Sequence, residues 1–166
     1  MNYSFISHRI WQGGTGKQIL KELGDAGMVV AVYLMTSPHA NQSGVYHCPI
    51  QYAATETNRT PDEFETCLVK LERLGFLKYD YEAEVVWIRN MVKFQVQNWP
   101  VEQKDHQYRG VLNALAAVPS SYLVQEFLEY WDISTVSTVG SLPRGLQGAS
   151  KGLHENPTKV VSGGVA

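Results

Sequence analysis

Basic and small polar side chains gather between residues 58 and 93, where their types suit contact with an acidic polymer. Arginine and lysine pair with phosphate oxygens, and threonine and asparagine donate hydrogen bonds to them. These are the contacts by which proteins hold the backbone of DNA. The sequence therefore predicts the following DNA-contact residues: Asn58, Arg59, Thr60, Thr66, Lys70, Arg73, Lys78, Arg89 and Lys93.

A glycine-rich segment at residues 13–17, Gly-Gly-Thr-Gly-Lys, invites comparison with a phosphate-binding loop, but its spacing is wrong. Counting back from Lys17, the first glycine of such a loop would fall on Trp11. The hydroxyl that holds magnesium would fall on Gln18. We therefore expect a flexible turn before a helix at this position, and no nucleotide site.

The other reactive side chains offer no catalytic or metal constellation. A zinc site needs four nitrogen or sulfur ligands, and the available histidines and cysteines lack the paired spacing of such sites. Cys67 fits a helix core and His47 a strand. The carboxylates between residues 62 and 72 fit a helix cap and a solvated face. The sequence thus predicts a non-enzymatic protein with no cofactor and no metal.

Two helices and a tight turn are predicted to position the contact residues. After Pro49, the residues Ile50, Ala53, Ala54 and Thr57 recur at the spacing of one helical face. The turn at residues 58–60 is followed by Thr60-Pro61-Asp62-Glu63, a capping box that must begin a second helix. Gly75 ends this helix, whose apolar stripe is Phe64, Cys67, Leu68, Leu71 and Leu74.

A β-hairpin is predicted directly after these helices, with strands at residues 76–79 and 85–89. Val85 and Trp87 would share one face of it, and Val86 and Ile88 the other. Residues 44–47 form a short β-type run suited to pairing as a third strand. This order of elements predicts the α+β fold class and, within it, a winged helix-turn-helix with a small antiparallel sheet.

Further helices are predicted on both sides of this unit. Residues 17–23 form a short helix ended by Gly24, and Asp25 caps another that stops at Ser37-Pro38. Later, a stripe at residues 108–118 and another at 123–131, broadened by Tyr122 and Leu128, predict two helices that pack back onto the body. We therefore expect a winged-helix domain at 1–99, a helical extension at 100–133 and a flexible Gly/Ser-rich tail at 134–166.

The formal charge of the chain, -2, lowers the expectation of tight autonomous DNA binding. The predicted second helix of the pair carries four acidic and two basic side chains, so it would repel phosphates near its N-terminal end. The hairpin tip is acidic as well, with Asp80, Glu82 and Glu84. These charges make a protein-facing role an alternative for this surface, together with exposed aromatic residues such as Tyr81.

Location and partners follow from what the sequence lacks. No run approaches the roughly 18 apolar residues of a membrane span, and residues 1–5 begin no apolar signal segment. Only Cys48 and Cys67 are present, which does not indicate a disulfide framework. We expect a cytoplasmic protein that does not bind membranes.

The pattern from Trp11 to Ile133 resembles the N-terminal winged-helix domains of bacteriophage replication proteins, namely replisome organisers and DnaD-type primosomal proteins. The resemblance rests on Trp11, the segment Tyr33-Leu34-Met35-Thr36-Ser37-Pro38-His39-Ala40-Asn41 at the end of the long apolar helix, Gly44-Val45-Tyr46, the cap at residues 60–63, Leu68-Val69-Lys70-Leu71-Glu72-Arg73-Leu74-Gly75, Val86-Trp87-Ile88-Arg89-Asn90 and Lys93-Phe94-Gln95. It implies a phage protein that binds origin DNA, organises a replisome or recruits a helicase loader.

Three functional hypotheses remain open from the sequence. The first is a replication protein that binds double-stranded DNA weakly alone and more firmly as a homo-oligomer, with a replicative helicase or another replisome protein as partner. The second is a winged-helix transcriptional regulator. The third is a protein-binding inhibitor of the anti-defence type, which makes no DNA contact and uses its acidic face against a basic host surface.

Overall fold

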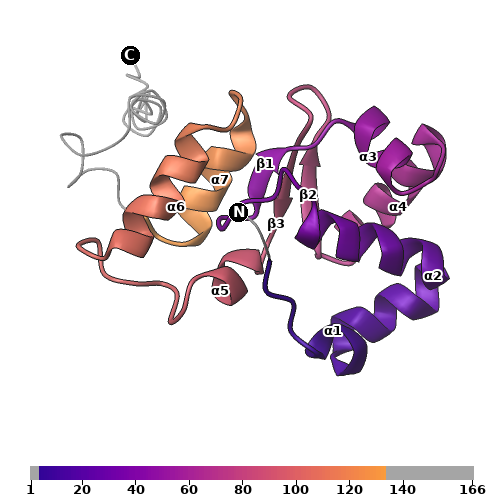
Figure 1. The fold of residues 1–166 in the computed structure, drawn as a ribbon, viewed down its shortest axis with the longest axis horizontal. Coiled ribbons are helices and arrows are strands. Elements are labelled where there is room, and N and C mark those ends of the chain that lie inside the picture. Colours follow the sequence, from indigo (N-terminus) through magenta and orange to yellow (C-terminus); the bar gives the residue numbers. More distant parts are fainter. Residues whose placement is uncertain (1–3, 134–166) are drawn as a thin grey trace, which may run out of the picture.

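The computed structural model describes residues 4–133, which form an α+β fold of helices around a three-stranded antiparallel sheet (Figure 1). The expected tail at 134–166 lies outside the described residues. The elements are α1 Arg9–Gln12, α2 Gly14–Thr36, β1 Val45–His47, α3 Ile50–Glu56, α4 Pro61–Arg73, β2 Leu77–Asp80, β3 Val85–Ile88, α5 Met91–Gln95, α6 His106–Ala116 and α7 Tyr122–Tyr130. Within the described range, no helix combines the length and apolar character needed to cross a bilayer.

The sheet forms the middle of three layers, with strand order β1-β3-β2. Val45 of β1 lies opposite Trp87, and Leu77 of β2 lies opposite Ile88, so the predicted hairpin and third strand are confirmed. Alternation along β3 sends Val86 and Ile88 into a core shared with α2, α3 and α4. It sends Val85 and Trp87 into a second core shared with α6 and α7.

Local sequence signals explain the α3–α4 unit. The Thr60 hydroxyl accepts from the Glu63 N–H at 3.2 Å, and the Glu63 carboxylate accepts from the Thr60 N–H at 2.8 Å, which is the predicted capping box. Gly75, at φ +71, closes the other end of α4. There the Phe76 N–H donates to the Leu71 carbonyl and the Gly75 N–H to the Glu72 carbonyl, a Schellman motif. Pro49 is the N-cap residue of α3.

The segment before the predicted helix at 17–23 is not the expected turn. Residues 14–17 form the first turn of α2, and the two predicted helices join as one element with a kink at Gly24. The glycines serve close packing here, because a Cβ on Gly16 would lie 1.6 Å from the Ile10 carbonyl oxygen of α1. This contact between α1 and α2 is not visible in the spacing of the residues.

Helices α6 and α7 cover the second face of the sheet, as predicted for residues 100–133. Their buried side chains include Leu112, Leu115, Leu123 and Phe127, and α7 contacts all three strands. Leu128 broadens the buried face of α7 as expected. Tyr122 does not: its side chain is 53% exposed, because it stands at the first position of α7 beside the buried pair Leu123 and Val124.

Candidate nucleic-acid interface

The predicted contact residues do not form one surface. Asn58, Arg59, Thr60, Thr66, Lys70 and Arg73 lie on α4 or on the turn before it, which packs on one face of the sheet. Lys78 lies opposite Trp87 in the sheet, so its side chain extends from the other face, toward α7. There its ammonium pairs with the carboxylate of Glu126. Lys78 therefore ties the hairpin to α7 and does not share a face with α4.

Arg89 and Lys93 also lie away from α4. Arg89 directly follows β3, is half-buried, and donates its backbone N–H to the Phe76 carbonyl at 3.2 Å. Lys93 belongs to α5, and its ammonium lies 5.0 Å from the centre of the Trp131 ring. Such a cation–π contact holds the ammonium while leaving it accessible to solvent.

A hollow of about 340 Å³ brings together three of the predicted residues: Arg59, Thr66 and Lys70. Leu23 and Ala26 of α2 form its apolar part. Neither Arg59 nor Lys70 has an ion-pair partner within residues 4–133. Asp62 and Glu63 line the same hollow, so its charge is mixed.

Of the other predicted residues near the hollow, Arg73 and Thr60 already have partners for their side chains. Arg73 pairs with Glu22 of α2 at 3.2 Å, although its side chain remains 70% exposed. The hydroxyl of Thr60 belongs to the capping box. Asn58 takes up the left-handed conformation of the turn, at φ +52, and its backbone N–H donates to the Thr55 carbonyl. Its amide side chain is exposed at the end of α3.

Asp80 was expected at the acidic hairpin tip, and this interpretation is wrong. Its side chain is only 7% exposed. Its carboxylate accepts from the Ser121 hydroxyl at 2.7 Å and from the N–H groups of Glu82 and Ala83, each at 3.1 Å. Burial opposes its charged form, yet these hydrogen bonds hold the pKa of Asp80 below its usual value. Asp80 therefore builds the turn and links it to α7.

A second stripe of α4 lies on the side of the hairpin. Unlike the hollow, it carries acidic side chains around an exposed apolar one. Glu65, Val69 and Glu72 follow one another at helical spacing, and Val69 is 53% exposed. Tyr81 of the β2–β3 turn is exposed nearby. Partial burial, followed by the charges of Glu65 and Glu72, raises its pKa. Sequence reasoning predicted that Tyr81 is exposed but did not identify Val69, whose position on the outward side of the helical period of α4 could have indicated it.

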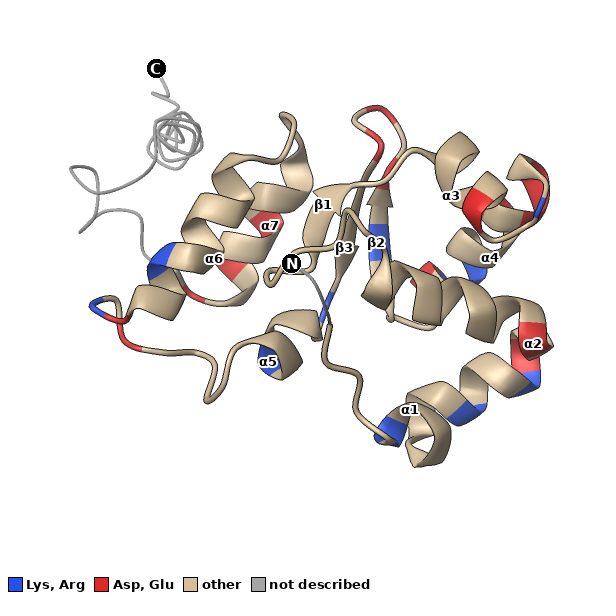
Figure 2. Cartoon of the chain, viewed as in Figure 1, with Lys and Arg blue, Asp and Glu red and all other residues tan. Residues whose placement is uncertain are grey.

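The charge distribution separates these regions (Figure 2). Acidic residues occupy the β2–β3 turn and the end of the molecule where α3 meets α4, whereas basic residues follow α1 and the first half of α2.

Cys48 and Cys67 are buried free thiols. No group of three histidine, cysteine, aspartate or glutamate side chains suited to a metal ion occurs between residues 4 and 133.

Comparison with known proteins gave no match to a protein-family model, a curated protein or a solved structure.

Proposed function

We propose that this chain is a non-enzymatic winged-helix protein that binds double-stranded DNA in the cytoplasm and acts in the initiation of phage-type DNA replication. The winged-helix proposal is supported by the order α2, β1, α3, α4, β2, β3 around the sheet β1-β3-β2. In this fold the second helix of the helix-turn-helix is the element that enters the major groove of DNA.

One observation carries the DNA proposal. α4 buries Phe64, Leu68 and Leu71 against the body, which leaves Thr66 and Lys70 on its outer side, in the same hollow as Arg59. A hydroxyl, an ammonium and a guanidinium are thus presented together next to the helix-turn-helix turn. These groups suit a phosphate of the DNA backbone, which sets position without reading sequence.

The acidic residues of α4 limit the affinity of one copy. Asp62 and Glu63 stand in the first turn of α4, where phosphates would otherwise approach a helix N-terminus. We infer that a single copy binds duplex DNA weakly and that homo-oligomers bind more firmly, because linked copies gain affinity without new contacts. A replicative helicase or another replisome protein is the proposed partner in such an assembly, on the basis of the resemblance to phage replication proteins.

A fluorescence anisotropy titration with a labelled duplex at two salt concentrations tests the DNA proposal. We expect Lys70→Gln to weaken binding about three- to tenfold and to reduce the salt slope by about one. Lys104→Gln is the matched control, because Lys104 is an exposed lysine in the loop before α6. Equal affinity of Lys70→Gln and the unmodified chain would contradict the assignment.

Selection of bound fragments from a phage genome separates replication from regulation. Enrichment of origin DNA is the result expected for a replication protein. Enrichment of promoters favours the alternative of a winged-helix transcriptional regulator, which would use the same α4 contacts.

The exposed stripe of Glu65, Val69 and Glu72 beside Tyr81 favours a second candidate function, that of a protein-binding inhibitor. An acidic surface with an apolar centre complements a basic protein surface and repels DNA. Two results together would favour this candidate over the first. The chain would show no duplex binding at low salt, and it would bind a purified basic partner in a salt-sensitive way that Val69→Asp abolishes.

A further inference from the structure

A cavity of about 420 Å³ lies between the N-terminal segment, the α1–α2 junction, the base of the hairpin and α5, and it shares no lining residue with the hollow beside Arg59. Its size falls within the range of sites that hold a small molecule. Arg9 and Lys93 are its charged lining residues, and no aspartate or glutamate among the described residues lines it. This is notable in a chain that carries 16 acidic residues and a formal charge of -2.

Two phenylalanines that are at least half exposed line this cavity. Phe5 is 59% exposed and Phe94 is 50% exposed, and both line the cavity. The Gln95 side chain holds the N-terminal segment in place, because it accepts from the Phe5 N–H at 3.2 Å and donates to the Phe5 carbonyl at 2.8 Å. This two-point contact keeps the segment of Phe5 against the helix that carries Phe94.

We infer that this cavity binds single-stranded nucleic acid. Exposed aromatic rings offer flat faces on which unpaired bases stack, and neighbouring cations attract the phosphates between the bases. Phe5 and Phe94 supply the rings here, and Arg9 and Lys93 supply the charge. Duplex DNA does not fit this chemistry, because its bases are already stacked inside the helix. The inference stands independently of the proposed duplex contacts of α4.

Binding of fluorescein-labelled dT15 to the full chain tests the inference, by anisotropy at 50 and 200 mM salt. We expect binding that weakens with salt, and a loss of affinity of roughly tenfold in Phe94→Ala, within the range of base–aromatic stacking. Arg9→Gln should weaken binding and lower the salt slope by about one. Because Arg9 is exposed, this second variant keeps the test valid if Phe94→Ala fails to fold.

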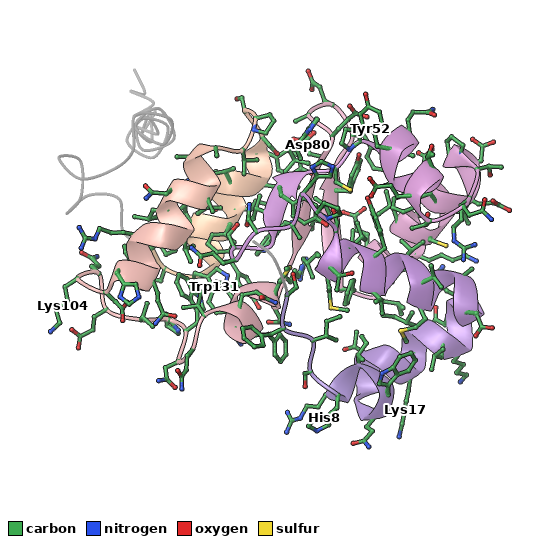
Figure 3. All side chains as sticks on the ribbon, viewed as in Figure 1. His8, Lys17, Tyr52, Asp80, Lys104 and Trp131 are labelled. Atoms are coloured by element: carbon green, nitrogen blue, oxygen red, sulfur yellow. The ribbon has the colours of Figure 1, made fainter. Side chains whose placement is uncertain are left out.

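Tyr52→Ala and Lys104→Gln are the matched controls. Tyr52 is 67% exposed on α3, and Lys104 lies at the left edge of the molecule, well away from His8 and Lys17 (Figure 3). Both should bind dT15 like the unmodified chain. Lys70→Gln should also bind dT15 normally, so that failure of the duplex proposal and failure of this one give different results.

Three results would overturn the inference. The first is no dT15 binding by the unmodified chain at 50 mM salt. The second is that folded Phe94→Ala and Arg9→Gln both bind dT15 as tightly as the unmodified chain, and the third is that Tyr52→Ala loses as much affinity as Phe94→Ala. A fourth is a change of oligomeric mass in Phe94→Ala, measured by sedimentation, with unchanged dT15 binding. That result would assign the exposed rings to contact between copies of the chain.

Discussion

Asp80 shows how a single buried carboxylate joins two parts of the molecule. It accepts hydrogen bonds from the β2–β3 turn and from Ser121, the N-cap residue of α7. Asp80→Ala would leave these donors without their partner, so we expect it to lower the free energy of unfolding by about 1–3 kcal/mol at pH 7. Urea denaturation measures the loss. Ser121→Ala, which removes one of the donors, should cost less than Asp80→Ala.

The contribution of Asp80 should depend on pH. Its pKa in the folded chain is lower than in the unfolded chain, so the unfolded state takes up a proton first as the pH falls. The stabilisation is therefore complete above the unfolded pKa of about 4 and is lost as the pH falls through the folded pKa. The gap in unfolding free energy between Asp80→Asn and the unmodified chain should shrink below pH 4. A constant gap from pH 7 to pH 3 would contradict the assignment.

The two thiols should be inert until the protein unfolds. Burial, followed by the charges of Glu56 and Glu84, raises the pKa of Cys48 to about 12, and burial also raises the pKa of Cys67. The thiolate is the reactive form of cysteine, so both side chains should resist a disulfide reagent at pH 8. Absorbance of the released chromophore should rise only after urea is added. Rapid release from the folded chain would show that a thiol is accessible.

Charge pairing explains why the candidate site was only partly predictable from the sequence. Lys78 and Arg73 were predicted as DNA contacts, yet they pair with Glu126 and Glu22, which lie far from them along the chain. No local pattern contains these partners. Arg59, Thr66 and Lys70 line one hollow because one helix and the turn before it place them, and helical spacing is a local property. Their role as DNA contacts stays a prediction.

At the scale of elements, the capping box makes a direct contribution to α4. Thr60→Ala removes the hydroxyl that accepts from the Glu63 N–H, so we expect a loss of about 1 kcal/mol in unfolding free energy. Thermal or urea denaturation measures it. Thr66→Ala is the matched control, because it makes the same change at an exposed position within α4, where alanine favours the helix. An equal loss in both variants would argue against the cap.

Elements whose signals are local were predicted well, and elements that depend on distant contacts were not. Caps, turn residues and alternation located α4, the hairpin and the strand at Val45. The first turn of α2 was missed because its glycines are explained by the approach of Ile10, a tertiary contact. The exposure of Tyr122 was missed because the packing of α7 against the sheet decides how many of its side chains are buried.

At the scale of the whole molecule, β3 connects the two cores. Val86 and Ile88 pack with α2, α3 and α4, while Val85 and Trp87 pack with α6 and α7. Both faces of one short strand are buried, so neither core can lose its packing without disturbing a strand that the other needs (Figure 1). This arrangement implies that residues 4–133 fold as one cooperative unit, with α6 and α7 as part of it.

Phe127→Ala tests this cooperativity. Phe127 is fully buried in the second core, where its ring contacts Trp87 edge-on with centroids 5.8 Å apart. The variant should lose about 3–5 kcal/mol, because a large cavity would remain beneath the sheet. Three of the four tryptophans, Trp87, Trp99 and Trp131, belong to the second core, and the fourth, Trp11, is exposed in α1, so Trp11→Phe is introduced as the background of both chains. If the two cores are coupled through β3, tryptophan fluorescence and far-UV circular dichroism should shift to the same lower midpoint. A fluorescence transition that precedes the loss of helix signal would instead mean that α6 and α7 detach while α2, α3 and α4 remain folded.

Val69→Ala, at an exposed position of α4, is the control and should leave both midpoints close to those of the unmodified chain.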